Sequence, residues 1–340
     1  MSLSRPVEIV GGGLAGLSLG LALRRQGVPV TVHDAGDYPR HRVCGEFIRG
    51  LQARTVETFG LAPLLADALP HRDVAWFAPG GELLRRQRLP TPALGLSRYA
   101  LDERLAHAFA RERGELRTRS RVDATPAPGR VFAGGRRPAS RSTWLGLKMH
   151  VRDLALDRGL EMHLGAQAYV GLCALPDGAV NLCGLFRRRA LASRGPALLL
   201  DYLHASGLDA LAARVRAAHP DAASVCAVAG LAFGRAAATP SPALGDAFAM
   251  IPPFTGHGMA MAFESAAVAL DPLVKWSRGE CDWSHAVQRA QQRLRNRFRV
   301  RLGVASLCHP FLLQPRGQRW LAAASRAGAL PLNTLQRLLS

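Results

Sequence analysis

The chain has 340 residues, 48% of them hydrophobic and 20% charged, which supports a sizeable globular core and excludes an intrinsically disordered chain. The formal net charge is +19, from 44 lysines and arginines against 25 acidic residues. This charge favours polyanionic partners but does not determine the fold. No uncharged apolar run reaches the roughly 18 residues that a membrane-spanning helix needs.

The first predicted elements form a βαβ unit, with a buried strand at residues 6–10, a helix at 14–26 and a second strand at 28–33. A Pro-Gly-Gly turn within residues 77–89 separates two runs of strand type and predicts a hairpin. Residues 100–113 carry apolar side chains at helical spacing.

Three strand-like runs between residues 146 and 186 predict an antiparallel sheet. Helices are expected over 196–219, and a strand over 225–233. Residues 241–276 then predict a strand, a turn rich in proline and glycine, and a long apolar helix beginning near Gly258. The remainder is predicted to be helical and broken by prolines. These breaks are expected at Pro310, Pro315 and Pro331.

The six cysteines show neither a C-x-x-C pair nor a zinc-type spacing with histidines, so we predict neither a metal site nor a redox pair. Residues 14–23 have the apolar character of a signal-peptide core. A strand-like segment and a glycine triplet precede them, however, and no cleavage site follows. We therefore expect a reduced, cytoplasmic protein, with association with a membrane surface left open.

The first functional pattern is Gly11-x-Gly13-x-x-Gly16, between the first strand and the first helix, with Asp34 ending the second strand. Glycines at this spacing permit a tight turn, close approach of a pyrophosphate to backbone N–H groups, and tight helix-to-strand packing. The helix N-terminus favours phosphate charge, and Asp34 is placed to accept hydrogen bonds from ribose hydroxyls. The pattern predicts a dinucleotide site.

The second pattern is Gly245-Asp246 after a strand, followed ten residues later by Gly256-His257-Gly258 at the start of a helix. Taken alone, it is equally typical of an ordinary strand-turn-helix. Asp246 is also placed to bind a sugar-like hydroxyl, and the backbone N–H groups at the helix start could face a ring that becomes anionic. Together with the first pattern, it indicates the second half of a flavin site.

A third stretch, residues 39–47 (PRHRVCGEF), joins basic side chains to a Cys-Gly-Glu triplet. With all three patterns, the chain resembles FAD-dependent oxidoreductases of the p-hydroxybenzoate-hydroxylase fold, on their geranylgeranyl-reductase-like branch. The resemblance extends to about Trp276. It implies an α/β fold in which a Rossmann-like, glutathione-reductase-type FAD-binding domain is interleaved with an antiparallel-sheet substrate domain, followed by C-terminal helices.

The resemblance also implies a domain organisation. The discontinuous FAD-binding domain would comprise residues 1–70, 96–145 and 236–280, and the substrate domain residues 71–95 and 146–235. Residues 281–340 would form the C-terminal helical segment. The implied cofactor-binding residues are Gly11, Gly13, Leu14, Ala15, Gly16, Asp34, Ala35, Arg42, Arg98, Gly245, Asp246, Pro253, Gly256, Gly258 and Met259.

Candidate catalytic residues come from the same resemblance. Cys44 and Glu46 would line the flavin face that meets substrate, and either could supply a proton, as a thiol of near-neutral pKa can. The alternative for Cys44 is a small buried apolar side chain. His257 could hydrogen-bond flavin or substrate, or could be an ordinary turn histidine.

The expected function is an FAD-dependent oxidoreductase that reduces a C=C bond, or performs related flavin redox chemistry, on a hydrophobic small molecule of isoprenoid, polyene or polyketide metabolism. NAD(P)H is a candidate electron donor. The segment VFAGGRRPASR has no acid where hydroxylases of this fold often have Asp-Gly, and the Trp-x-Trp-x-Ile-Pro signature of halogenases is missing. An aromatic monooxygenase is one alternative; a basic RNA- or membrane-binding protein with a vestigial nucleotide fold is another.

Two further features concern substrate and partners. Apolar residues of the predicted sheet suit a hydrophobic substrate and equally an ordinary core. They are Met149, Met162, Tyr169, Leu172 and Leu185. The arginine run at 293–302 is best explained as a solvated helix; an anionic membrane surface or an acidic carrier protein holding the substrate comes next, and nucleic acid last.

Overall fold

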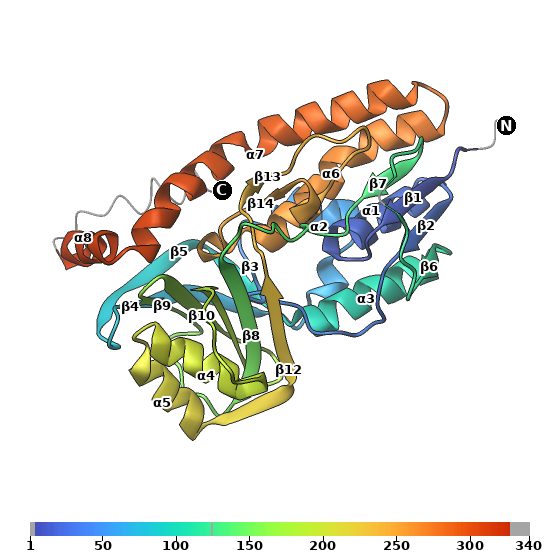
Figure 1. Ribbon diagram of the computed structural model, residues 1–340. Coiled ribbons are helices and arrows are strands. Elements are labelled where there is room, and N and C mark those ends of the chain that lie inside the picture. The colour runs from blue at the N-terminus through green and yellow to red at the C-terminus, as the bar shows by residue number, and fades with distance from the viewer. Residues whose placement is uncertain (1–3, 124, 327–340) are drawn as a thin grey trace.

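The computed structural model describes residues 4–123 and 125–326 (Figure 1). Four parallel strands form one sheet, in the order β6 (Glu115–Arg117), β2 (Val30–His33), β1 (Val7–Val10) and β7 (Arg130–Phe132). If the four strands of this sheet are numbered in chain order, their spatial order is 3-2-1-4, as in dinucleotide-binding folds. The predicted βαβ unit is therefore confirmed.

A second sheet has eight strands in the order β12-β8-β11-β10-β9-β4-β5-β3. Their bounds are β3 (Phe47–Ile48), β4 (Leu69–Phe77), β5 (Leu83–Gly95), β8 (Trp144–Arg152), β9 (Leu160–Gly165), β10 (Ala168–Ala174), β11 (Val180–Arg187) and β12 (His219–Ala229). The predicted hairpin is the β4–β5 pair. The sheet is mixed rather than purely antiparallel because β4 and β9 pair in parallel, across a connection long enough to permit it.

Helices cover both sheets. The parallel sheet is accompanied by α1 (Leu14–Arg25), α2 (Ala53–Phe59), α3 (Arg98–Arg111) and α6 (Gly258–Ser277). The helical segment predicted at 196–219 is two helices that pack on the eight-stranded sheet, α4 (Gly195–Ala205) and α5 (Asp209–Ala217). Three short 3-10 turns are η1 (Ala62–Leu64), η2 (Gly245–Ala247) and η3 (Pro253–Thr255); β13 (Gly234–Arg235) pairs with β14 (Ala249–Met250).

The long helix α7 (Trp283–Leu313) packs on α6 and reaches β9 and β10, and α8 (Pro315–Arg326) then contacts β5 (Figure 1). The predicted break at Pro310 is wrong, because α7 continues through this residue. The break at Pro315 is confirmed: Gln314 is extended, as a residue before proline prefers. Pro331 lies outside the described residues. None of the described helices combines the length and apolarity needed to cross a bilayer.

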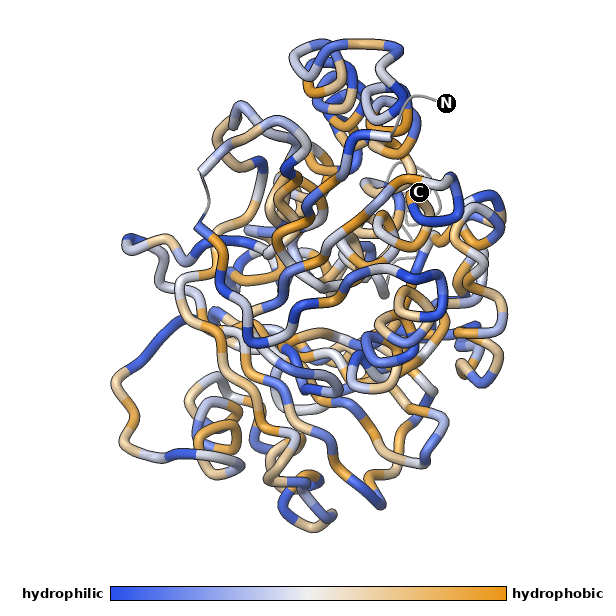
Figure 2. The backbone as a smooth tube through the Cα atoms, turned by 90° about the vertical axis from the view of Figure 1, so that its right-hand side faces the viewer, coloured by the Kyte–Doolittle hydropathy of each residue, from blue (hydrophilic) through white to orange (hydrophobic). Residues whose placement is uncertain are grey.

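The core of the parallel-sheet lobe is centred on α1, in which every residue from Leu14 to Leu23 is buried. Helix α1 lies between the sheet and α6, so it meets protein on both sides. Figure 2 shows short hydrophobic and hydrophilic stretches alternating along the chain, as expected of elements that bury one side. The tight packing of α1 requires glycine at Gly16, where a Cβ atom would lie 1.9 Å from the carbonyl oxygen of Gly11.

We expect Gly16→Ala to destabilise the protein by about 1–3 kcal/mol or more, because the backbone of Gly11 cannot move away from the added methyl group. Gly303→Ala is the matched control, since Gly303 also lies in a helix but a Cβ atom there meets no neighbour. That substitution should stabilise by about 0.5–1 kcal/mol. Chemical denaturation measures both, and equal effects would contradict the packing argument.

Candidate functional site

A cavity of about 1360 Å³ is lined by residues of both sheets, a volume above the roughly 300–1,000 Å³ of most small-molecule sites. The parallel-sheet side contributes the loop after β1 and the end of β2. The eight-stranded sheet contributes apolar side chains, among them Met162, Tyr169 and Leu185. The cavity is therefore large enough for a dinucleotide with a second molecule beside it.

The cavity brings together segments that are far apart in the sequence. Every predicted cofactor-binding residue lines it apart from Gly16, which holds α1 against the strand. The lining residues from this set are Gly11, Gly13, Leu14, Ala15, Asp34, Ala35, Arg42, Arg98, Gly245, Asp246, Pro253, Gly256, Gly258 and Met259. Of the three candidate catalytic residues, Cys44 lines the cavity, whereas Glu46 and His257 do not.

The glycines at the start of α1 have different physical tasks. Gly11 has a φ of 115°, and a Cβ atom there would lie 2.3 Å from the backbone nitrogen of Gly134. At Gly13 a Cβ atom would meet only the Arg98 guanidinium, at 4.0 Å. Gly13 therefore leaves its backbone accessible from the cavity at a helix N-terminus, as phosphate binding requires.

Asp34 fixes the geometry beside this turn. Its Oδ2 accepts a hydrogen bond from the backbone N–H of Gly12 at 2.9 Å, and its Oδ1 accepts one from Gly36 at the same distance. Arg40 forms an ion pair with Oδ1, and Arg42 Nη2 lies 3.5 Å from Oδ2. A ribose hydroxyl that binds Asp34 would therefore replace an arginine contact.

Arg98 and Arg42 share the buried carboxylate of Asp102, which the sequence patterns did not single out. Arg98 binds both oxygens, at 2.7 and 2.8 Å, and Arg42 Nε lies 2.8 Å from Oδ2. Burial lowers the pKa of Arg98, but the charge and hydrogen bonds of Asp102 outweigh it, so the pKa is raised. The available signal was the i, i+4 spacing of Arg98 and Asp102 on one helix.

Arginine dominates the charge of the cavity. Six arginines line it, namely Arg40, Arg42, Arg98, Arg121, Arg136 and Arg137. Two carboxylates, Asp34 and Asp246, also belong to the lining. The buried Nη1 atom of Arg136 has no hydrogen-bond partner within the described part of the chain. This excess of donors fits the phosphates of a flavin dinucleotide.

Asp246 faces the cavity from η2. The residue is exposed to the cavity, yet the surrounding walls desolvate its carboxyl enough to raise the pKa to about 6, against the opposing effect of Arg98 and Arg136. The neighbouring Gly245 has a φ of 56° and donates its N–H to Ser265 Oγ on α6 at 2.9 Å. The Gly-Asp pair is thus held by α6, the helix that also begins at Gly258.

Cys44 faces the same cavity, but its thiol is not the near-neutral acid that was expected. Burial raises its pKa, and the opposing charge of Arg98 does not offset this. Two hydrogen bonds fix the residue: Asn181 donates to the Cys44 carbonyl at 3.0 Å, and the Glu46 N–H donates to Cys44 Sγ at 3.4 Å. At neutral pH the group is therefore a protonated thiol.

Glu46 is fully buried, and its carboxylate points away from the cavity lining. Oε1 accepts hydrogen bonds from the Arg98 N–H at 3.0 Å and from Ser97 Oγ at 3.3 Å, which caps the N-terminus of α3. Oε2 lies 2.6 Å from His150 Nε2, and Lys148 Nζ lies 3.6 Å from Oε1. This position supports a structural task rather than direct contact with substrate.

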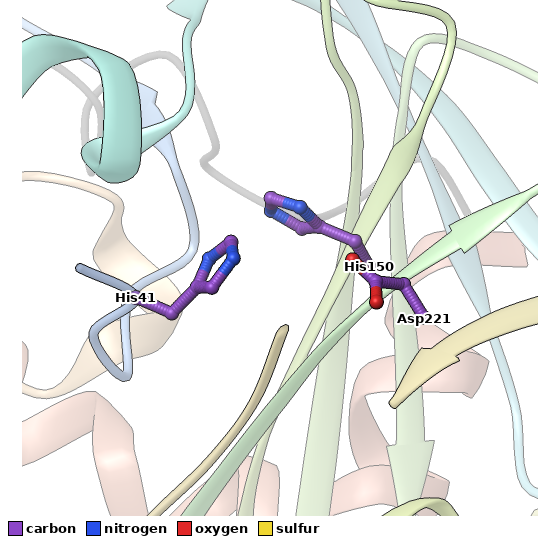
Figure 3. A group of neighbouring side chains, drawn as sticks. All are labelled: His41, His150 and Asp221. Carbon is purple, nitrogen blue, oxygen red and sulfur yellow. The ribbon is translucent and has the colours of Figure 1, made fainter. Parts of the chain in front are cut away.

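Beside Glu46, His41 of the 39–47 loop faces His150 of β8 and Asp221 of β12 (Figure 3). One possible ligand atom from each of the three residues lies within 4.8 Å of the other two, so the spacing alone would permit a bound metal ion. Lys148 Nζ, however, lies 3.0 Å from His41 Nδ1. A lysine ammonium can only donate, so Nδ1 accepts and the proton stays on Nε2, which disfavours a cation here.

His257 lies behind the cavity wall. It is fully buried, a Cβ atom at Gly50 would lie 3.0 Å from its ring, and neither ring nitrogen has a hydrogen-bond partner among the described residues. Burial lowers its pKa to about 3, and the charges of Arg49 and Arg301 add to this. The ring is therefore neutral, and this placement does not support contact with flavin or substrate.

The parallel sheet with its glycine turn and the adjoining cavity define an α/β protein with the fold of dinucleotide-binding domains. A family model described as an NAD(P)-binding Rossmann-like domain matches residues 9–46. Menaquinone reductase of Mycobacterium tuberculosis (strain ATCC 25618 / H37Rv) is 30% identical over 105 residues, or 30% of this chain. The aligned part spans 26%, about a quarter, of that relative's length.

Similar solved structures cover nearly the whole chain. PqsL, a probable FAD-dependent monooxygenase from Pseudomonas aeruginosa, is 17% identical with a TM-score of 0.71, covering 93% of this chain and 99% of that one. HpxO of Klebsiella pneumoniae, solved with FAD and uric acid, is 17% identical with a TM-score of 0.76, covering 98% and 96%. p-Nitrophenol 4-monooxygenase PnpA of Pseudomonas putida DLL-E4 is 15% identical, with a TM-score of 0.75 and coverage of 100% and 97%. The chain therefore has the fold of FAD-dependent monooxygenases.

We expect Glu46→Gln to destabilise the protein by about 3–5 kcal/mol, because it leaves Lys148 as a buried charge without its partner. Adding Lys148→Met should recover most of that loss, since it removes the unpaired charge. Denaturation of the single variants and the double variant measures the coupling. Additive losses would show that the two residues do not stabilise each other.

Proposed function

We propose that the protein is an FAD-dependent oxidoreductase that acts on a hydrophobic small molecule. The observation that carries this proposal is the shared cavity, in which a phosphate-type turn, six arginines and the Gly245–Asp246 and Gly256–Gly258 segments meet an apolar wall. The two halves of the proposed cofactor site lie more than 200 residues apart in the sequence. They meet because α6 packs on α1.

The residues present fit a flavin dinucleotide. Gly11, Gly13 and Asp34 would hold its ADP half, and Arg98, backed by Asp102, would neutralise the linking phosphates. Asp246 would bind ribityl hydroxyls, and the segment from Pro253 to Met259 would follow the ring edge. Bound flavin supplies two-electron redox chemistry, while the protein orients the reactants and excludes water.

We propose reduction of the substrate as the main reaction, on the geranylgeranyl-reductase-like branch. The curated relative is named a menaquinone reductase, and the apolar wall suits a lipid-soluble quinone or a related polyene. The position of Cys44 in the cavity supports the same branch. NAD(P)H is the proposed electron donor, in line with the family model that matches residues 9–46.

In this reaction Cys44 is the proposed proton donor. Its raised pKa keeps the proton on sulfur at neutral pH, and Arg98 nearby would stabilise the thiolate left after transfer. Asn181 holds the Cys44 carbonyl, and the Glu46 backbone N–H holds the Cys44 sulfur. Glu46 is thus proposed as a positioning residue.

Aromatic hydroxylation is the second candidate, favoured by the fold shared with PqsL, PnpA and HpxO. It needs no thiol acid, so the behaviour of a Cys44 variant distinguishes the two reactions. The proposed partner in both is a small molecule. We also propose a cytoplasmic location, supported by six cysteines that are all free thiols.

We expect wild-type protein to bind FAD and Gly13→Val to remain folded without binding it, because the side chain would project into the phosphate region instead of into protein. Gly171→Val is the matched control. Gly171 also lines the cavity, but on the eight-stranded sheet, where a Cβ atom meets neighbours no closer than 3.8 Å. Flavin absorbance after gel filtration measures retention, and a wild type that binds no FAD would overturn the proposal.

We expect Cys44→Ser to slow substrate reduction by about 10²–10⁴-fold, the usual contribution of a positioned acid, while FAD binding is unchanged. Cys183→Ser is the control, because that thiol is half-buried like Cys44 and also lines the cavity, but lies on β11. Single-turnover oxidation of reduced flavin by substrate gives the rate. Equal rates for wild type and Cys44→Ser would show that Cys44 is not the proton donor.

A further inference from the structure

The C-terminal helices carry most of the large apolar side chains exposed on the described surface. Four of them belong to α7 and α8, with exposed fractions of 50% for Val300, 74% for Leu307, 52% for Phe311 and 58% for Trp320. Spacings of seven and four residues place the first three on one face of α7. The Phe311 and Trp320 rings are 6.2 Å apart, so these four side chains form the α7–α8 strip.

The charge around this strip has one sign. No acidic residue follows Asp282 in the sequence, whereas nine arginines lie between residues 283 and 326. Arg299, Arg316 and Arg319 are exposed, and no ion pair joins them to any residue that the structure describes.

Three other arginines of α7 form ion pairs with acidic residues of α6. Arg297 and Arg301 bind Glu264 of α6, and Arg293 binds Asp271 of the same helix. These three charges are therefore neutralised, whereas Arg299, Arg316 and Arg319 are left for solvent or a partner.

We infer that the α7–α8 strip docks the protein peripherally on an anionic lipid surface. Apolar side chains would enter the interface, and the long arginine side chains would reach the headgroup phosphates. A lipid surface offers both an apolar interior and negative charge. A second copy of the chain, paired symmetrically through this strip, would place arginines against arginines with no acid between them.

The opposite face of the same helix reaches the cavity. His309 lies 3.4 Å from Tyr169 Oη, and its ring packs against Trp144, Phe233 and Phe254. Tyr169 lines the cavity. Docking would thus place the apolar part of the cavity near the lipid. This consequence rests on the proposed function, whereas the docking itself does not.

The test is co-sedimentation of the full chain with vesicles of phosphatidylcholine containing phosphatidylglycerol, and with phosphatidylcholine alone. One variant carries Leu307→Ser, Phe311→Ser and Trp320→Ser. A second carries Arg299→Gln, Arg316→Gln and Arg319→Gln. The control carries Arg54→Gln, Arg111→Gln and Arg194→Gln, three exposed arginines outside α7 and α8, so it has the same net charge as the second variant.

We expect wild type to bind the anionic vesicles, more weakly at high salt, and to bind neutral vesicles poorly. At about fivefold for each arginine near the surface, the second variant should bind about a hundredfold more weakly. The serine variant should also lose binding, and the scattered control should keep it. A blue shift of tryptophan emission on vesicles that is lost in Trp320→Ser alone gives a second readout from a folded protein.

Three results would overturn the inference. One is wild type that does not bind anionic vesicles. The second is a control that loses as much binding as the second variant, since net charge alone would then explain it. The third is evidence that the strip forms a protein interface instead. Wild type would then form a dimer or a complex with an acidic protein, the serine variant would lose that association, and wild type would not bind vesicles. Because no step needs flavin, loss of FAD binding leaves the test intact.

Discussion

The buried carboxylate of Glu46 is the constraint on which the rest of the site depends. It accepts hydrogen bonds at the N-terminus of α3 and pairs with His150 and Lys148 of β8, so one side chain joins the two lobes. A carboxylate this deep is tolerated only when its oxygens are satisfied. Its backbone has a φ of 56°, which turns the chain so that Cys44 faces the cavity while Glu46 faces the protein.

A second set of charges fixes the other end of the same loop. Arg40 and Arg42 reach Asp34 beside the glycine turn, and Arg42 also reaches Asp102 under Arg98. Ion pairs with carboxylates therefore hold both ends of the 39–47 loop, although the cavity that this loop borders is strongly positive. Each acid has two arginine partners, so an anionic ligand meets guanidinium groups that are already oriented. This preorganisation lowers the entropy lost on binding.

The sequence predicted those parts of the site that depend on local backbone geometry. Gly11, Gly13 and Gly256 could be placed because turns at strand and helix ends demand glycine, and periodicity placed the helices around them. Asp102, Lys148 and His150 could not, since their roles arise from β8 pairing and from how α3 meets the loop. The direction of His257 was equally undetermined: a turn histidine one residue from two cavity glycines points into the core instead.

Helix α7 links the chemistry of the cavity to the outer surface. Its inner face supplies His309 to an aromatic cluster beside Tyr169, and burial there lowers the histidine pKa to about 4, so the cluster is uncharged at neutral pH. Its outer face combines apolar side chains with arginine and no acid. A helix selected only to pack on α6 would need neither the exposed apolar residues nor this charge bias. If the proposed function and the proposed docking hold, the same segment would supply both an apolar wall for the substrate and a surface on which the substrate is delivered.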